Sequence, residues 1–331
     1  MPGQRSDLVA VFMKDSYKAV FKAYGKESTR YNLIYSVKTG VTGAGDKETQ
    51  IIGAGPLTRH TVEGQNIEFK TPVEGWSYYV KYWTFSDGLA FSPEASEDAI
   101  KFGNLIKAFA ATWGEQVRIA KETLAARVFN VGGATSGDWV LNGTHTGNTD
   151  PSGNLLYDGK PVFAISGNEH TTKGGGTYYN SVSGLDVIPG DFERVYNLHV
   201  STNNRNERDQ IIRNPADTIL TKPGASYFKA WRITMTSKGM PGDDINDENP
   251  YYKTVKPMDW DYLNDTDPVA YIGKAKSDSW QFHERKNPEI RYYRHEPNAG
   301  YHASIRIRIG VFLKDFRNWT RLGGSSSASY S

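Results

Sequence analysis

The histidines are the residues of this chain best suited to metal binding and acid–base chemistry, but their spacing indicates neither. The sequence has 7 of them, and no two are four residues apart, the spacing that places two imidazoles on one face of a helix around zinc. We expect them to be surface residues or hydrogen-bonded residues. They are His60, His145, His170, His199, His283, His295 and His302.

Motifs for binding phosphate or calcium are also incomplete. Gly43–Gly45 and Gly174–Thr177 lack the Lys-Ser/Thr pair that follows the glycines of a phosphate-binding loop. Asp244, Asn246 and Glu248 have the spacing of the first ligands of a calcium loop, but its glycine and its late glutamate are missing. The chain has no cysteine, which excludes disulfides and thiolate metal sites. We therefore predict no catalytic residue, no metal and no cofactor, in a protein that is not an enzyme.

The composition is that of an ordinary globular protein. The chain has 331 residues, of which 38% are hydrophobic and 23% charged, enough for roughly two domains with buried cores. The 39 Lys and Arg against 37 Asp and Glu leave a net charge of +2, which disfavours a protein whose main task is to neutralise nucleic acid. No apolar stretch approaches the roughly 18 residues of a membrane helix, and the first residues lack the apolar core of a signal peptide.

The periodicity of apolar residues predicts a helical N-terminal arm and one long helix. In residues 1–30, apolar side chains recur at helical spacing among basic residues, which predicts a basic arm with one amphipathic helix. The sequence Ser92-Pro93-Glu94 has the residue types of a helix start. An apolar stripe then continues to about residue 129, where Gly132-Gly133 ends it. A helix of this length would be on the order of 50 Å long.

Two alternating segments predict a long hairpin that needs a neighbour. Residues 66–70 and 78–85 alternate with a period of two, and the turn signal 71–76 lies between them. Large apolar side chains on both faces of such a hairpin cannot bury one another. We therefore predict that the hairpin rests on neighbouring mass, either its own body or another subunit, and our hypothesis is that one strand face and the preceding tryptophan make intersubunit contacts. These contact residues are Trp76, Tyr79, Lys81, Trp83 and Phe85.

The second half of the chain reads as mixed structure. A strand is predicted at 217–221, a helix at 225–231 and a flexible Gly- and Ser-rich tail at 323–329. With the long helix and the hairpin, these elements predict an α+β fold.

A strongly alternating strand near the C-terminus carries two candidate contact residues. Over residues 304–312, isoleucines share one face while Arg306 and Arg308 share the other. The segment 243–267 is acidic, whereas 281–331 is basic. Arg306 and Arg308 suit intersubunit ion pairs with such an acidic patch as well as contacts with phosphate, and both alternatives stay open.

The order of these segments resembles that of the major capsid proteins of tailed bacteriophages, which have the Hong Kong 97-like fold. Residues 53–64 are similar to the entry of the extended E-loop, 90–98 to the segment entering the spine helix, and 174–180 to a Gly-Gly-Thr-Tyr-x-Asn element after that helix. Residues 216–223 resemble the central strand of the A domain, and 292–322 the closing strand and tail. Each motif is loose by itself, and their order is what makes the resemblance specific.

This resemblance implies a division of the chain into named parts. They are an N-arm, an E-loop, a P domain with the spine helix, an A domain, and C-terminal strands that return to the P and A domains before a flexible tail. The implied bounds are 1–30, 31–91, 92–190, 191–290 and 291–331, in that order.

The resemblance also implies a structural function. The chain would self-assemble into an icosahedral shell of hexamers and pentamers, which encloses double-stranded DNA and contacts it weakly and without sequence specificity. The implied partners are further copies of the chain, a portal protein, and separate scaffold and cement proteins, in a virion capsid assembled in the bacterial cytoplasm. Lys47, Lys70 and Lys81 match no cross-linking motif, so no covalent cross-link between subunits is predicted.

Two other functions remain open at this point. An encapsulin-type compartment would have the same fold and enclose a protein cargo in place of DNA. A carbohydrate-binding protein would use the aromatic side chains, 13% of the chain, to line a groove for saccharides.

Overall fold

The computed structural model describes residues 18–25, 28–52, 57, 59–64, 66, 67, 69, 71, 73–92, 102–133, 156, 158–184, 189–202, 204–224, 236–239, 248–263, 269–295 and 300–323. Within these residues the chain combines two larger sheets, two small two-stranded sheets and one long helix. This mixed content agrees with the predicted α+β fold.

The two larger sheets have non-sequential strand orders. The four-stranded sheet has the order β1-β11-β12-β4 and the five-stranded sheet the order β7-β13-β10-β8-β9. The first consists of β1 Tyr35–Thr39, β4 Trp83–Phe91, β11 Ser277–His295 and β12 Gly300–Leu313. The second consists of β7 Ser181–Val182, β8 Thr218–Thr221, β9 Lys256–Asp259, β10 Val269–Gly273 and β13 Trp319–Gly323. The strand predicted at 217–221 is therefore confirmed as β8.

The remaining elements are short, apart from one helix and one hairpin. The small sheets pair β2 Gly45–Ile52 with β3 Val73–Lys81 and β5 His170–Thr171 with β6 Thr177–Tyr178. The helices are α2 Tyr31–Ile34, α4 Phe102–Asn130, α5 Pro189–Asn197, the π-helix η1 Leu198–Thr202 and the 3-10 helix η3 Phe316–Asn318. Residues 18–24 are also helical, as predicted for the arm, whereas residues 1–17 lie outside the described residues.

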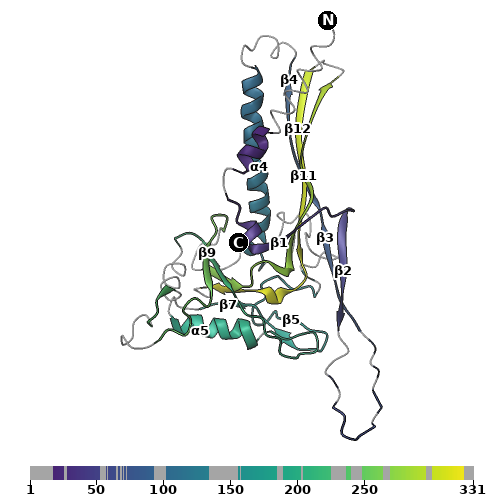
Figure 1. Ribbon diagram of the computed structural model, residues 1–331, viewed down its shortest axis with the longest axis vertical. Helices are drawn as coiled ribbons and strands as arrows, with labels where there is room; N and C mark the ends of the chain where they lie inside the picture. Colours follow the sequence, from purple (N-terminus) through teal and green to yellow (C-terminus); the bar gives the residue numbers. More distant parts are fainter. Residues whose placement is uncertain are drawn as a thin grey trace.

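The helix α4 runs alongside the long strands β4, β11 and β12, and the pair β2–β3 projects away from the body (Figure 1). The helix α5 packs against the five-stranded sheet through Phe192 and Val195. The hairpin thus extends beyond the two-sheet body (Figure 1).

The long helix ends where the sequence predicts. Its 29 described residues finish at Asn130 and give a length of about 43 Å. A side chain at Gly132 would collide with the Phe163 ring and the Val128 carbonyl oxygen, so the stop signal also permits close packing. The predicted helix start is Ser92-Pro93-Glu94. Of these three residues, only Ser92 belongs to the described part of the chain.

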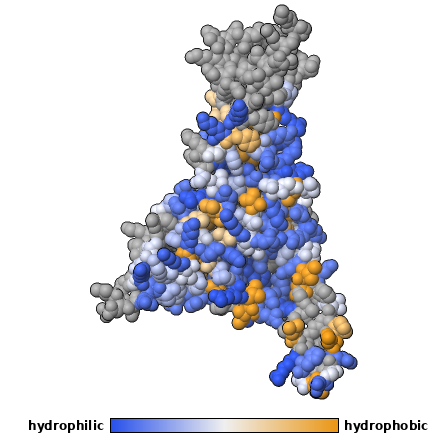
Figure 2. Space-filling model, viewed as in Figure 1, coloured by the Kyte–Doolittle hydropathy of each residue, from blue (hydrophilic) through white to orange (hydrophobic). Residues whose placement is uncertain are grey.

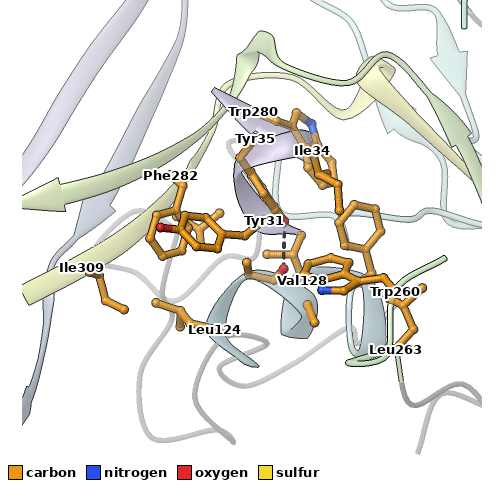
Figure 3. Packing of buried hydrophobic residues seen from close by; sticks show 14 of the residues in the cluster. Tyr31, Ile34, Tyr35, Leu124, Val128, Trp260, Leu263, Trp280, Phe282 and Ile309 are labelled. Carbon is orange, nitrogen blue, oxygen red and sulfur yellow. Dashed lines mark hydrogen bonds between the residues drawn. The ribbon is translucent and has the colours of Figure 1, made fainter. Parts of the chain in front are cut away.

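The main core lies between α4 and the four-stranded sheet. The isoleucines of β12, Ile305, Ile307 and Ile309, are buried in it, while Arg306 on the other strand face is exposed. This confirms the predicted alternation. Figure 3 shows Tyr31, Tyr35, Trp280 and Phe282 packed with α4 residues Leu124 and Val128; all belong to the main core cluster.

The predicted pairing of the hairpin is wrong. Strand β3 pairs with β2, for example Thr49 opposite Ser77, and not with residues 66–70, whose described members 66, 67 and 69 form no strand. Strand β2 reads Gly-Asp-Lys-Glu-Thr-Gln-Ile-Ile, and most of its side chains are exposed. Because neither face is buried against a core, its sequence carries no alternation of apolar residues.

The prediction of a single strand over residues 78–85 is also wrong, because this segment is divided between the strands β3 and β4. The chain leaves the hairpin after Lys81 and enters β4 at Trp83, where it pairs with β12 of the four-stranded sheet. Tyr79 and Lys81 therefore belong to a different sheet from Trp83 and Phe85, and the four residues do not share one continuous face.

The glycine-rich segment 174–180 is a packing element. Side chains at Gly174 or Gly176 would collide with the carboxylate of Asp209, which accepts a hydrogen bond from Thr172 Oγ1 at 2.6 Å. Asn180 is buried and donates its side-chain amide to the carbonyl oxygens of Val162, Phe316 and Trp319, at 2.8, 3.0 and 3.2 Å. The segment thus joins the loop after α4 to the closing strand β13.

Several other predictions fall on residues outside the described part of the chain. These are the helix at 225–231, the whole of the tail after Gly323 and two of the three residues of the calcium-like run. Among the described residues, no group of His, Asp and Glu side chains is arranged to hold a metal ion. None of the described helices is long and apolar enough to cross a membrane.

A substitution at Gly114 tests how closely the N-terminal helical segment, residues 18–24, packs against α4. An added Cβ would collide with the Val20 carbonyl oxygen and lie 3.0 Å from the Cβ of Ala23. Gly114→Ala raises helix propensity by about 1 kcal/mol, yet we expect it to lower the free energy of unfolding by about 1–3 kcal/mol because of this overlap.

The measurement is urea unfolding, combined with hydrogen exchange of residues 18–24. Gln116→Ala, at an exposed position of the same helix, is the matched control and should be neutral or slightly stabilising. Equal stabilities of the two variants would contradict the packing argument.

Candidate intersubunit surfaces

The projecting hairpin carries apolar side chains that its own subunit does not cover. Leu57 and Phe69, which lie between β2 and β3, are 101% and 93% exposed. Apolar residues gather at the end of this projection, at the lower right of the view (Figure 2). Because exposed apolar patches mark contact sites, this end is the best candidate for an intersubunit surface. Its other exposed apolar residues are Ile51, Val62 and Ile67.

The base of the hairpin, by contrast, is packed firmly on the body. Tyr78, Val80 and Tyr82 are buried with Phe312 of β12, and Trp76 packs beside them. The apolar residues of β3 nearest the body thus fill a small core of their own, and the distal residues of the hairpin have no such partner.

Trp76 connects the hairpin to the closing segment of the chain through a buried carboxylate. Its indole Nε1 donates to Glu207 Oε2 at 3.1 Å, and the Lys173 ammonium lies 3.8 Å from the centre of its ring. Glu207 also accepts from Arg317 Nη2 at 3.0 Å, and the side chains of this ion pair are only 2% and 4% exposed. Because a buried charge needs such partners, Glu207 fixes Trp76 and Arg317 relative to each other.

A second charged group holds the other hairpin strand. Lys314 Nζ lies 2.8 Å from Glu48 Oε2 on β2 and 3.2 Å from Asp278 Oδ2 on β11. Burial alone would lower the pKa of Lys314, but its hydrogen bonds to Glu48 and Asp278 raise it above the usual value. The lysine is therefore charged at neutral pH, and it bridges hairpin and body.

The predicted contact residues are spread over three environments. Trp76, Trp83 and Phe85 are half-buried against their own subunit, the last two against the main core. Arg306 is exposed, and Arg308 is half-buried and donates to the Ala44 carbonyl oxygen at 3.4 Å.

The two remaining predicted contact residues can be located by strand register alone. Tyr79 lies opposite Lys47, and Lys81 lies opposite Gly45. Both positions therefore belong to the projecting hairpin. The contacts of all seven residues with a second subunit stay predictions.

Arg306 borders an open groove on the outer face of the four-stranded sheet. Arg291 and Lys286 both bind Glu289 there, each at a distance of 2.7–2.8 Å. The groove has a volume of about 630 Å³, and most of the residues that line it are of polar or charged types. It is lined by Ser86, Asp87, Gly88, Glu289, Arg291, Tyr293, Ser304, Ile305 and Arg306.

Sequence reasoning missed the groups that fix the hairpin base. Glu207, Lys173 and Lys314 lie far from β2 and β3 in the sequence and stand in no recognisable motif. The available signal was the glycine-rich run 174–176, which marks a close approach of two chain segments without naming the partner.

Comparison with known proteins supports the fold alone. The sequence matches no protein-family model and no curated protein. The structure is similar to the capsid structure of cyanophage P-SCSP1u, with a TM-score of 0.54 and 9% identity over 91% of this chain and 89% of that chain. It is also similar to the capsid of the native GTA particle, with a TM-score of 0.51 and 11% identity over 88% of this chain and 89% of that one.

The mature capsid of bacteriophage PhiM1 is a third similar structure, with a TM-score of 0.51 and 8% identity over 89% of this chain and 87% of that chain. The chain therefore has the fold of these capsid proteins over most of its length. At such low sequence identity, the structural similarity shows the fold and nothing more.

Trp76→Phe tests whether the bond to Glu207 holds the hairpin base. The substitution keeps an aromatic ring near Lys173 and removes one hydrogen bond to a charged group, which is worth about 1.5–3 kcal/mol. We expect amide hydrogen exchange in β2 and β3 to become about tenfold faster or more, with β10 and β13 unchanged. Ile51→Ala, at a side chain that is 73% exposed on β2, should leave exchange unchanged, and an equal effect of both substitutions would refute the assignment.

Proposed function

We propose that the chain is a major capsid protein that self-assembles into an icosahedral shell of hexamers and pentamers enclosing double-stranded DNA. The observation that carries the proposal is the projecting hairpin, whose distal apolar side chains stay uncovered on a body with the fold of phage capsid proteins. A shell subunit can bury such a surface on its neighbour, and weak contacts multiply across a closed assembly.

Within this proposal the chain has the Hong Kong 97-like division into parts. Residues 1–30 act as the N-arm, 31–91 as the E-loop, 92–190 as the P domain and 191–290 as the A domain, with 291–331 returning to the P and A domains. The β2–β3 hairpin is then the extended section of the E-loop, and α4 is the spine helix.

The residues proposed to contact other subunits fall into two groups. The first lies on or beside the hairpin and supplies aromatic and basic side chains: Trp76, Tyr79, Lys81, Trp83 and Phe85. The second consists of Arg306 and Arg308, of which Arg306 is exposed at the edge of the groove and suited to an acidic group on a neighbour.

The proposed partners follow from the same role. They are other copies of the chain, a portal protein, separate scaffold and cement proteins, and packaged DNA held by weak contacts, in a virion assembled in the bacterial cytoplasm. No catalytic role is proposed for any residue, since the similar structures are those of capsids.

The location of the tryptophans disfavours the carbohydrate-binding alternative. Trp113, Trp260, Trp280 and Trp319 are buried, and the other two tryptophans that the structure describes are half-buried. The polar groove described above contains no tryptophan. A stacking surface for sugar rings needs aromatic faces open to solvent.

Replacing the distal apolar residues tests the shell-forming role. We expect the wild-type chain to give closed shells or capsomer rings in sedimentation and negative-stain electron microscopy. Leu57→Ser combined with Phe69→Ser removes two exposed apolar groups that the fold of the subunit does not use, so assembly should be lost while the thermal unfolding of the subunit stays the same.

The matched control is Leu57→Met combined with Phe69→Leu, which keeps the apolar character and should keep assembly. Intact shells from the serine variant would contradict the proposed contact. Nucleic-acid-free shells that carry a protein cargo in the native source would favour the compartment alternative.

A further inference from the structure

Along the chain, a single residue separates the hairpin strand β3 from the body strand β4. Strand β3 ends at Lys81 and β4 begins at Trp83, so Tyr82 alone separates a strand of the hairpin from a strand of the four-stranded sheet. Any change in the angle of the hairpin must therefore alter the backbone at or next to Tyr82. The Tyr82 side chain is buried, and its position reports how the two sheets meet.

The partner of Tyr82 is a buried histidine of the body. The Tyr82 hydroxyl lies 3.0 Å from Nδ1 of His283 on β11, and the other ring nitrogen, Nε2, lies 2.8 Å from Gln281 Oε1. Gln281 donates its amide Nε2 to Asp278 at 2.6 Å, which leaves Oε1 as an acceptor. His283 Nε2 must then carry a proton, so Nδ1 accepts a hydrogen bond from the Tyr82 hydroxyl.

This arrangement suits a neutral imidazole. A proton added at Nδ1 would turn the acceptor into a donor, so the Tyr82 hydroxyl would have to rotate until its oxygen accepts from Nδ1. The imidazolium would then be a charge enclosed in a fully buried site, which is costly. Burial also raises the pKa of Tyr82 to about 12, so the tyrosine stays protonated throughout the acid range.

Charges of both signs lie around His283. Asp46 and Glu48 of β2 favour the imidazolium, whereas Lys38 of β1 and Lys314 after β12 disfavour it. An apolar group also lies beside the imidazole, since the ring centres of His283 and Phe312 are 5.3 Å apart. Burial is therefore the largest effect and lowers the pKa of His283 to about 4. The groups that face this ring, from each element packed against it, are Lys38, Asp46, Glu48, Tyr82, Gln281, Phe312 and Lys314.

We propose that His283 is the positioning residue of the hairpin, which holds Tyr82 in place while neutral and releases the joint between β3 and β4 when protonated. The two protonation states differ in the hydrogen bond at Tyr82, the residue that connects β3 to β4. If the hairpin contacts a neighbouring subunit, as proposed above, acid would alter which surface of that neighbour it reaches.

The sign of the pH dependence follows from the two pKa values. In an opened joint, His283 would titrate near the ordinary 6.5, and in the closed joint it titrates at about 4. The closed state is therefore fully favoured above pH 6.5 and loses its advantage progressively as the pH falls towards 4. The equilibrium for opening should rise roughly 300-fold over this window, the factor given by the difference between the two pKa values.

Hydrogen exchange of the unassembled chain tests the proposal. Exchange rates of β2 and β3 amides, corrected for intrinsic pH dependence, should rise at least tenfold from pH 7 to pH 4.5. The glutamine of His283→Gln can still form hydrogen bonds but does not titrate. This substitution should therefore abolish the step, meaning the rise in hairpin exchange between pH 7 and pH 4.5. A wild-type chain with no step, or the same step in His283→Gln, would overturn the proposal.

His199 provides the matched control. It is also buried, burial also lowers its pKa to about 4, and it binds Thr320 in the five-stranded sheet, away from the hairpin. His199→Gln should therefore keep the full hairpin step, and loss of the step would show that the acid effect is global. If His283→Gln does not fold, the ¹⁵N shifts of the wild-type imidazole still decide, since a proton on Nδ1 at pH 7 would contradict the proposed tautomer.

Discussion

Two charged side chains on one turn of α4 hold three parts of the chain together. Lys121 and Glu122 are 2% and 1% exposed. Lys121 Nζ lies 2.8 Å from Glu284 of β11 and 3.1 Å from the Tyr24 hydroxyl. Glu122 accepts hydrogen bonds from the Arg30 backbone at 2.6 Å and from Trp260 Nε1 at 2.8 Å. Burial raises the pKa of Glu122, and these donors partly offset the rise. Removing the Glu284 carboxylate from the buried ion pair with Lys121 would cost about 3–5 kcal/mol.

The aromatic cluster at the end of α4 joins the two sheets into one body. Phe129 lies between rings from both sheets, with centres 5.3 Å away at Trp280 and 5.4 Å away at Trp319. Tyr271 of the five-stranded sheet also donates its hydroxyl to the Phe129 carbonyl oxygen at 2.9 Å. Since these rings belong to a single buried cluster, the sheets cannot move independently without exposing it. The hairpin lies outside this cluster, which leaves it as the part whose direction is set by a few local contacts.

Elements that bury one face were predictable from the sequence, whereas elements stabilised by backbone pairing or distant charges were not. The end of α4, the strand β8 and the alternation of β12 follow from apolar periodicity and glycine stops, because burial imposes those patterns. Strand β2 has no such pattern, so its pairing with β3 was assigned to the wrong segment. Trp76 was identified as a contact residue from its type, but its bond to Glu207 depends on a residue 131 positions away. No spacing rule connects such a pair.

The helix α4 and the strand β12 have matched lengths. The 29 residues of the helix extend about 43 Å, and the 14 residues of the strand extend about 48 Å. Because the two lie side by side with a shared core, neither can grow alone. A related chain with a longer body would need about two helical residues for every strand residue added, in α4 and in both neighbouring strands at once. Changes of size in this architecture are therefore expected to occur in the loops and in the hairpin, where one insertion needs no partner.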